Sequence, residues 1–220
     1  MSKQVGDPQL VTRAIPLICL LCGVAGSVDA VAYLLCGQVF VSNMTGGTVL
    51  LAISLLQRNM GDAALRGGLV VAFLAGVIVA RLLARIAGRR LTKRQRVSVL
   101  GIESIVLLVL AWKSAGAHTG LLLLLAGTLG VQNAAFRSIG GLHLNTTFIT
   151  GDLELLGEAI MEPHDSLSKV SAFLLSWIAY AGGALLGSLG ARSFPHHGFL
   201  LPMILAVTSV AAVALMPEGP

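Results

Sequence analysis

Apolar residues run along this chain in eight segments separated by charged residues, Gly or Pro. Six of the segments are long and apolar enough to cross roughly 30 Å of hydrocarbon as α-helices, and two are interrupted by polar residues. The pattern predicts an all-α membrane protein with about six transmembrane helices and two polar, half-depth elements in a single transmembrane domain over residues 1–220. The eight segments cover about residues 14–37, 39–57, 67–87, 97–115, 119–138, 142–160, 168–190 and 198–216.

The first polar segment, 39–57, contains the stretch SNMTGGTVLL. Thr and Asn before a Gly pair and an apolar run predict a break followed by a helix start near Gly47, capped by Thr45 or Asn43. Irregular backbone at membrane depth needs protein or water to satisfy its hydrogen bonds. We therefore expect a discontinuous helix beside a cavity, with Gly46 at the break.

The second polar segment, 142–160, contains TTFITGDLELL. Here we expect Thr150 to cap the helix, with Asp152 and Glu154 in the first turn, where carboxylates suit the helix dipole. The first break then offers a positive helix end to an anionic group, and the second supplies its own negative charge and suits a cation. The alternative is that both segments are tight crossings of small residues that only bring helices close together.

A weak internal repeat relates the two halves of the chain. A shift of 104 residues superposes several small residues and places Asp29 on Asn133, and a shift of 105 then places Thr45-Gly46 on Thr150-Gly151. Repeats of this kind are typical of two-halved membrane bundles. We expect repeat 1 to cover about residues 14–115 and repeat 2 about 119–216.

Charge predicts the orientation in the membrane. The net charge is +5, but the chain is 55% hydrophobic and only 11% charged, which is too little polar surface for a water-soluble globule of this size. Seven of the fifteen Lys and Arg residues lie in or just before one connector at about residues 85–96. Such a basic connector is typical of a cytoplasmic loop, so we expect the lipid bilayer and not a nucleic acid as the partner.

Two topologies remain open at this stage. If 39–57 and 142–160 span fully, eight helices cross and several basic residues fall on the non-cytoplasmic side. If these segments dip in and return, six helices cross and the halves become inverted repeats of three spans each. The second topology obeys the positive-inside rule better and places both termini in the cytoplasm.

The stretches GSVDAVAYLLCGQVFVSNMTGGTVLL and GVQNAAFRSIGGLHLNTTFITGDL resemble the YoaK family, catalogued as domain of unknown function 1275. The resemblance covers nearly the whole chain. It implies a multi-pass protein of the bacterial inner membrane. The family has no established activity, so the resemblance supplies no substrate and no catalytic residue.

Asp29 lies about midway along the first span, where an ionised carboxylate costs roughly 2.5–3.5 kcal/mol. Its side chain either binds a proton or cation beside a central cavity or only ties helices together through hydrogen bonds. Its repeat partner Asn133 is nearly isosteric with a neutral Asp. The pair therefore has one member that is able to change its charge.

These observations favour a small transporter or permease for an unknown small solute, coupled to a proton or cation through Asp29. The alternative is a non-transporting membrane partner with an assembly or regulatory role. An enzyme is a weaker third hypothesis, because the sequence shows neither a nucleophile beside a base nor a cluster of metal ligands, and we expect no metal or other cofactor. The candidate solute- or ion-binding residues are Asp29, Asn43, Thr45, Gly46, Asn133, Thr147, Thr150, Gly151 and Asp152.

Small residues also recur at helical spacing in two predicted spans. Ala72, Gly76 and Ala80 form one such stripe, and Gly183 and Gly187 form another. Stripes of this kind allow close packing of membrane helices, either within one chain or across the face of a homodimer. Both uses remain open from the sequence.

Overall fold

The computed structural model describes residues 8–86, 88, 91–113, 118–139, 141–147, 149–161 and 167–216. The basic residues Arg89 and Arg90 of the predicted cytoplasmic connector lie outside these ranges. The described residues form eight α-helices, one 3-10 helix and one two-stranded hairpin. They are α1 (Pro8–Leu35), α2 (Met44–Leu56), α3 (Met60–Ile86), α4 (Lys93–Trp112), α5 (Thr119–Ala135), β1 (Ser138–Ile139), β2 (Leu142–His143), α6 (Ile149–Met161), α7 (Leu167–Ser193), η1 (Pro195–His197) and α8 (Leu200–Leu215).

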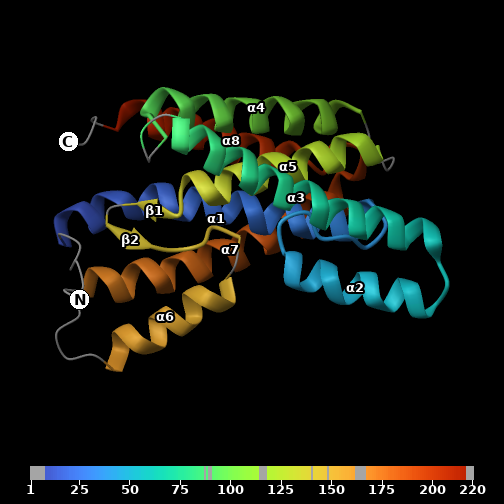
Figure 1. Ribbon diagram of the computed structural model, residues 1–220, viewed down its shortest axis with the longest axis horizontal. Helices are drawn as coiled ribbons and strands as arrows, with labels where there is room; N and C mark the ends of the chain where they lie inside the picture. Colours follow the sequence, from blue (N-terminus) through green and yellow to red (C-terminus); the bar gives the residue numbers. More distant parts are fainter. Residues whose placement is uncertain are drawn as a thin grey trace.

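The long helices lie side by side along one axis, with α1 in the middle of the bundle (Figure 1). Helix α1 packs against α7 and α8, and α5 packs against α3 and α4. The short helices α2 and α6 pack on α3 and α7. Their N-terminal ends lie near the middle of the long axis, and the two helices run outward to opposite ends of the bundle (Figure 1).

Five helical segments are long and apolar enough to cross a membrane: those containing α1, α3, α4, α7 and α8. The expected sixth span, 119–138, is shorter than predicted, because α5 has 17 residues and ends at Ala135. The chain then turns into the β1–β2 hairpin, in which Ser138 pairs with His143 and Gly141 has a φ of 83°. A 17-residue helix stands at the lower limit for crossing the hydrocarbon core.

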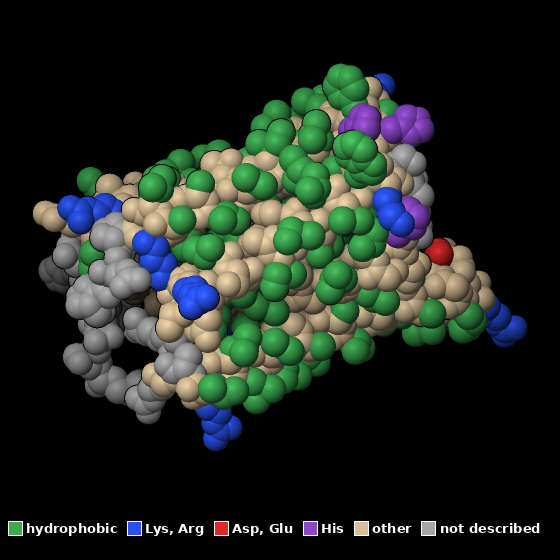
Figure 2. Space-filling view, turned by 90° about the horizontal axis from the view of Figure 1, so that it is seen from above, with side chains coloured by type: hydrophobic (Ala, Val, Ile, Leu, Met, Phe, Trp, Pro, Cys, Tyr) green, Lys and Arg blue, Asp and Glu red, His purple; other side chains and the backbone are tan. Residues whose placement is uncertain are grey.

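The surface agrees with a membrane location. Hydrophobic side chains cover the long side of the molecule, and Lys and Arg side chains gather toward its two ends (Figure 2). The exposed large hydrophobic residues include several on the outer faces of α3 and α7. An apolar band between charged ends is what a bilayer requires, since lipid tails offer no hydrogen bonds to polar groups.

Both stripes of small residues are used for packing inside the chain. A Cβ on Gly183 would lie 2.3 Å from the carbonyl oxygen of Gly23, so α1 and α7 are in backbone contact. A Cβ on Gly76 would lie 2.0 Å from the carbonyl oxygen of Gly127, which shows the same contact between α3 and α5. Small residues permit this approach because any larger side chain would hold the helix axes apart.

Candidate functional site

The carboxylate of Asp29 holds the first break in place. Asp29 is only 3% exposed, and five donors reach its two oxygens. Oδ1 accepts from the backbone N–H groups of Val41 and Ser42, both at 2.7 Å, and Oδ2 accepts from Ser42 Oγ at 2.7 Å and from the Asn43 N–H at 2.9 Å. The fifth donor is the hydroxyl of Tyr180 on α7, at 2.9 Å from Oδ2. The irregular backbone before α2 is thereby satisfied by protein, as backbone at membrane depth must be.

Asn43 continues this chain of contacts into α2. It is the N-cap residue, and its Oδ1 accepts from the Gly46 N–H at 3.0 Å. The capping role predicted for Thr45 or Asn43 therefore belongs to Asn43, and α2 begins at Met44 and not near Gly47. Position 46 has no room for a side chain larger than that of glycine, because a Cβ there would lie 2.9 Å from the ring of Phe40. Thr45 is exposed on the first turn.

The second break uses different side chains. Asn133 Oδ1 accepts from the backbone N–H of Thr146 at 3.2 Å, as Asp29 accepts from Ser42 in the first half. The carboxylate in this half is Asp152, which is 0% exposed and accepts at Oδ1 from the Asn145 N–H at 3.1 Å. Asp152 stands in the first turn of α6, as predicted. Each break thus has one buried carboxylate, but Asp29 lies on the helix before the first break and Asp152 on the helix after the second.

The remaining predicted residues of the second break have weaker roles. Thr150 is an exposed residue inside the first turn of α6, so it does not occupy the capping position that the sequence predicts. Thr147 is buried and Gly151 is partly buried. Glu154 is exposed on α6, beyond the first turn.

Helix α7 connects the two breaks. Ser176 Oγ lies 3.2 Å from Asp152 Oδ2 and 2.8 Å from the carbonyl oxygen of Phe173, so its one proton serves either acceptor. Tyr180 is four residues further along the same helix and donates to Asp29. Residues at this spacing lie on one face, one turn apart. The two buried carboxylates, Asp29 and Asp152, therefore meet neighbouring turns of α7.

A buried network extends the second break toward α4. Glu103 and Gln132 are both 0% exposed. With the Gln132 amide nitrogen turned toward Glu103, it donates to Oε2 at 2.8 Å and to Oε1 at 3.0 Å. The other end of the amide lies 3.4 Å from Thr146 Oγ1. Glu103 is thus linked through Gln132 to the backbone segment that Asn133 holds.

Arg66 braces the other end of α2. Its buried guanidinium donates to the Ser54 hydroxyl and to the carbonyl oxygen of Leu50 at 3.1 Å. It also reaches the carbonyl oxygens of Gly37 and Gln38, each at 3.5 Å, in the linker after α1. The sequence pattern places Arg66 in a loop, because the apolar run begins at residue 67. The structure corrects this, since α3 begins at Met60 and includes Arg66.

Sequence reasoning missed Tyr180, Ser176, Gln132 and the role of Arg66. Tyr180 and Ser176 sit in a long apolar segment where single hydroxyls are common. Their spacing of four residues was the one available signal, because it places both hydroxyls on one face of the helix. Among the described residues, no three His, Cys, Asp or Glu side chains form a group that could hold a metal ion.

Comparison with known proteins identifies relatives over nearly the whole chain. The model of a family described as "Protein of unknown function (DUF1275)" matches residues 17–214. The UPF0700 transmembrane protein YoaK of Bacillus subtilis (strain 168) is 30% identical over 215 residues, covering 92% of this chain and 95% of the relative. No solved structure matches significantly. The relatives therefore support a transmembrane protein, and their names assign no activity.

Proposed function

Since the chain belongs to the DUF1275 family and is similar to a transmembrane protein over most of its length, we propose that it is a transporter for a small solute. It lies in the bacterial inner membrane with both termini in the cytoplasm. This orientation is supported by the start of α1 and the end of α8, which lie at the same end of the bundle as the start of α4 (Figure 1). The basic residues Arg81, Arg85, Lys93 and Arg94 belong to the end of α3 and the start of α4.

The observation that carries the proposal is the meeting of two buried carboxylates, Asp29 and Asp152, on neighbouring turns of α7. Each one holds the backbone at the N-terminal side of a short helix. Transporters with discontinuous helices place substrate and coupling-ion sites at such breaks. Intramembrane carboxylates of this kind are functional candidates because an ion in lipid is costly.

Asn133 occupies the position in the second half that corresponds to Asp29 in the first, so the two side chains can be compared. The uncharged side chain of Asn133 holds one backbone N–H, that of Thr146, whereas the Asp29 carboxyl group holds three, those of residues 41–43. A carboxylate offers about four acceptor sites, and adding a proton turns one of them into a donor. A proton or cation at Asp29 would thus loosen at least one of the N–H groups at 41–43 and release the start of α2.

The packing of the helices supports an arrangement of two inverted repeats. Helix α1 lies on α7 as α5 lies on α3, and α2 lies on α3 as α6 lies on α7. The close glycine contacts follow the same scheme: a Cβ on Gly26 would meet the Tyr180 carbonyl, and one on Gly130 would meet the Phe73 carbonyl. Alternating access then consists of changes at α2 and α6 that open toward opposite sides of the membrane.

Flux in proteoliposomes tests the proposal. We would measure uptake of a labelled panel of inorganic ions, carboxylates, amino acids and sugars, with a pH-sensitive dye inside the vesicles. Wild type should move at least one solute together with protons or cations, and Asp29→Asn and Asp152→Asn should lower that flux at least ~10-fold. Glu154→Gln, which removes an exposed carboxylate of the same short helix, is the matched control. The proposal fails if no solute moves, or if both buried-site variants transport as wild type does.

A second candidate function rests on the same hydrogen bonds. The five donors around Asp29 also suit a protein whose breaks are static and whose role is to assemble with or regulate another membrane protein. In that case Asp29→Asn lowers stability but the wild type carries no flux. The flux assay and the unfolding measurements described below therefore separate the two candidates.

A further inference from the structure

A cavity of about 370 Å³ lies at the end of α3, apart from the breaks. Its walls come from α3, the start of α4, the end of α5 and the β1–β2 hairpin. Small side chains leave the space open: Ala80 and Ala84 on α3, and Ala134 and Ala135 on α5. Its volume lies in the range of pockets that take small ligands or headgroups.

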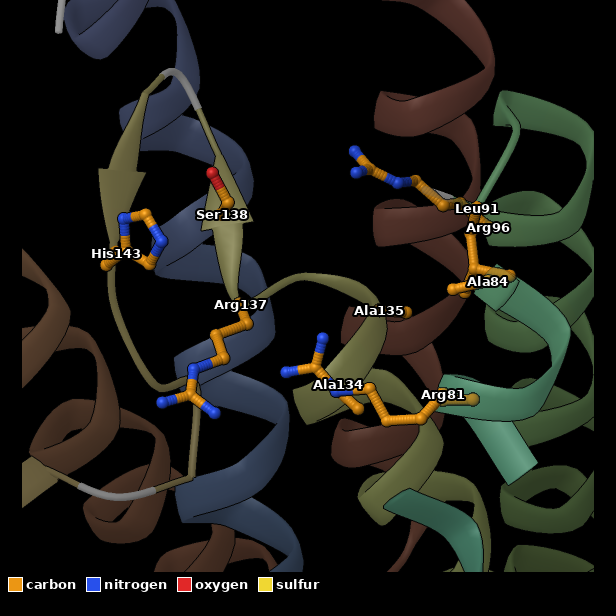
Figure 3. Close-up of a pocket in the computed structure, with 10 residues that line it drawn as sticks. Arg81, Ala84, Leu91, Arg96, Ala134, Ala135, Arg137, Ser138 and His143 are labelled. Carbon is orange, nitrogen blue, oxygen red and sulfur yellow. The ribbon is translucent and has the colours of Figure 1, made fainter. Parts of the chain in front are cut away.

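Three arginines from three different elements line this cavity: Arg81 of α3, Arg96 of α4 and Arg137 after α5. Figure 3 shows Arg81 and Arg96 extending toward the hairpin from α3 and α4, while Arg137, Ser138 and His143 lie on the hairpin side. The guanidinium of Arg96 lies 5.4 Å from the ring centre of Phe136, which orients it. No acidic side chain belongs to the described lining.

Bringing like charges together costs free energy unless an anion offsets their repulsion. In the described part of the chain, neither Arg81 nor Arg137 has a carboxylate partner within ion-pair distance. Arg81 and Arg137 are exposed, and together with Arg96 they line one space that alanines keep open. Guanidinium groups match the oxygens of phosphate with paired hydrogen bonds, which a single ammonium does not provide.

We propose that this cavity is a binding site for a phosphate-bearing anion, held by Arg81, Arg96 and Arg137. The inference goes beyond the transport function, because neither Asp29 nor Asp152 belongs to the described lining of this cavity. A phospholipid headgroup and a free phosphate share the required chemistry. Basic pockets between transmembrane helices on the cytoplasmic side are known to take anionic headgroups, and the cavity lies at the basic end of the bundle.

The test compares two double variants of the full chain in lipid nanodiscs. Arg81→Gln with Arg137→Gln removes two charges from the cavity. Arg85→Gln with Arg94→Gln removes two exposed charges from α3 and α4 that do not line it, and is the charge-matched control. Thermal unfolding and size-exclusion chromatography check that both double variants fold. Arg96 is left intact because it packs on Phe136.

Two binding assays distinguish the sources of the anion. In phosphatidylcholine nanodiscs, inorganic phosphate is titrated and followed by calorimetry. In nanodiscs with added phosphatidylglycerol and no phosphate, retention of that lipid is measured by native mass spectrometry. We expect the cavity variant to lose at least ~10-fold in one or both assays, and the control to lose less than ~2-fold.

Loss in the phosphate assay alone assigns the site to a soluble anion, and loss in the lipid assay alone assigns it to a headgroup. Either result, or both together, supports the proposal. The proposal is overturned if wild type binds neither probe, or if the cavity and control variants change binding equally.

Discussion

Tyr180 and Ser176 stand one turn apart on α7, and each faces a different buried carboxylate. The hydroxyl of Tyr180 lies 2.9 Å from Asp29 Oδ2, and that of Ser176 lies 3.2 Å from Asp152 Oδ2. Asp29 fixes the segment before α2, and Asp152 fixes the segment before α6. A single face of α7 thus contacts Asp29 on α1 and Asp152 in the first turn of α6. We therefore expect a change at one carboxylate to affect the other through α7.

Removing the Tyr180 hydroxyl should weaken the first break without disturbing the packing around it. We expect Tyr180→Phe to lower the free energy of unfolding by about 1 kcal/mol, because a hydrogen bond to a buried carboxylate is lost. Unfolding in mixed micelles with increasing SDS measures this. Tyr33→Phe is the control, since Tyr33 is 38% exposed and stacks on Phe40. Equal effects of the two changes would contradict the role of Tyr180.

Neutralising Asp29 should free the backbone that it holds. In Asp29→Asn the amide nitrogen cannot accept, so at least one N–H of residues 41–43 loses its partner, at a cost of about 1–3 kcal/mol. Hydrogen exchange should become faster at residues 41–46 and stay unchanged in α4. Asn133→Gln, which keeps an amide in the second half, should leave exchange at 41–46 unaltered. Unchanged protection in Asp29→Asn would contradict the anchoring role.

Two adjacent glycines of α7 should respond in opposite ways to alanine. A Cβ on Gly183 would lie 2.3 Å from the Gly23 carbonyl oxygen, whereas a Cβ on Gly182 meets nothing within 4 Å. We expect Gly183→Ala to cost about 1–3 kcal/mol through overpacking. Gly182→Ala should be neutral or stabilise by up to ~1 kcal/mol through helix propensity. Similar midpoints of SDS unfolding for the two variants would show that α1 and α7 are not in backbone contact.

Arg66 should not be replaceable by Lys. Its planar group reaches Ser54, the Leu50 carbonyl and two carbonyls of the linker after α1, and an ammonium cannot span these acceptors. We expect Arg66→Lys to lose about 2 kcal/mol and to raise proteolysis between α1 and α2. Arg58→Lys, at an exposed position, serves as the control. Resistance to protease equal to the wild type would argue against the bracing role.

Much of the fold can be predicted from the sequence, because apolar runs and helix caps are local signals. The eight predicted segments correspond to the eight α-helices of the described residues. The sequence predicts Thr45 or Asn43 as the cap of α2, and the cap is Asn43. The ends of segments were less predictable. Helix α5 stops at Ala135, where the chain turns into a hairpin. Helix α3 starts at Met60, after Asn59, whose Oδ1 accepts from the Asp62 N–H, and so it includes Arg66.

The site itself was only half predictable. Asp29 and Asp152 are conspicuous, since carboxylates are costly in apolar segments. The role of α7 could not be predicted in the same way. Ser176 and Tyr180 reach these carboxylates only because α7 packs on α1 and α6 in the folded chain. The arginine cavity depends likewise on three elements meeting at one end of the bundle. Long-range packing of this kind has no local signature.

The most direct test of the account is cysteine accessibility in intact cells and inverted vesicles, with Cys19, Cys22 and Cys36 replaced. Single probes at Thr48 of α2 and Glu154 of α6, both exposed in the structure, are labelled with an impermeant thiol reagent. Lys113 and Arg94, at opposite ends of α4, supply the side controls. We predict that Thr48 labels from the Lys113 side and Glu154 from the Arg94 side. Labelling of both from one side, or of neither while the controls react, would contradict two half-depth helices that open toward opposite sides of the membrane.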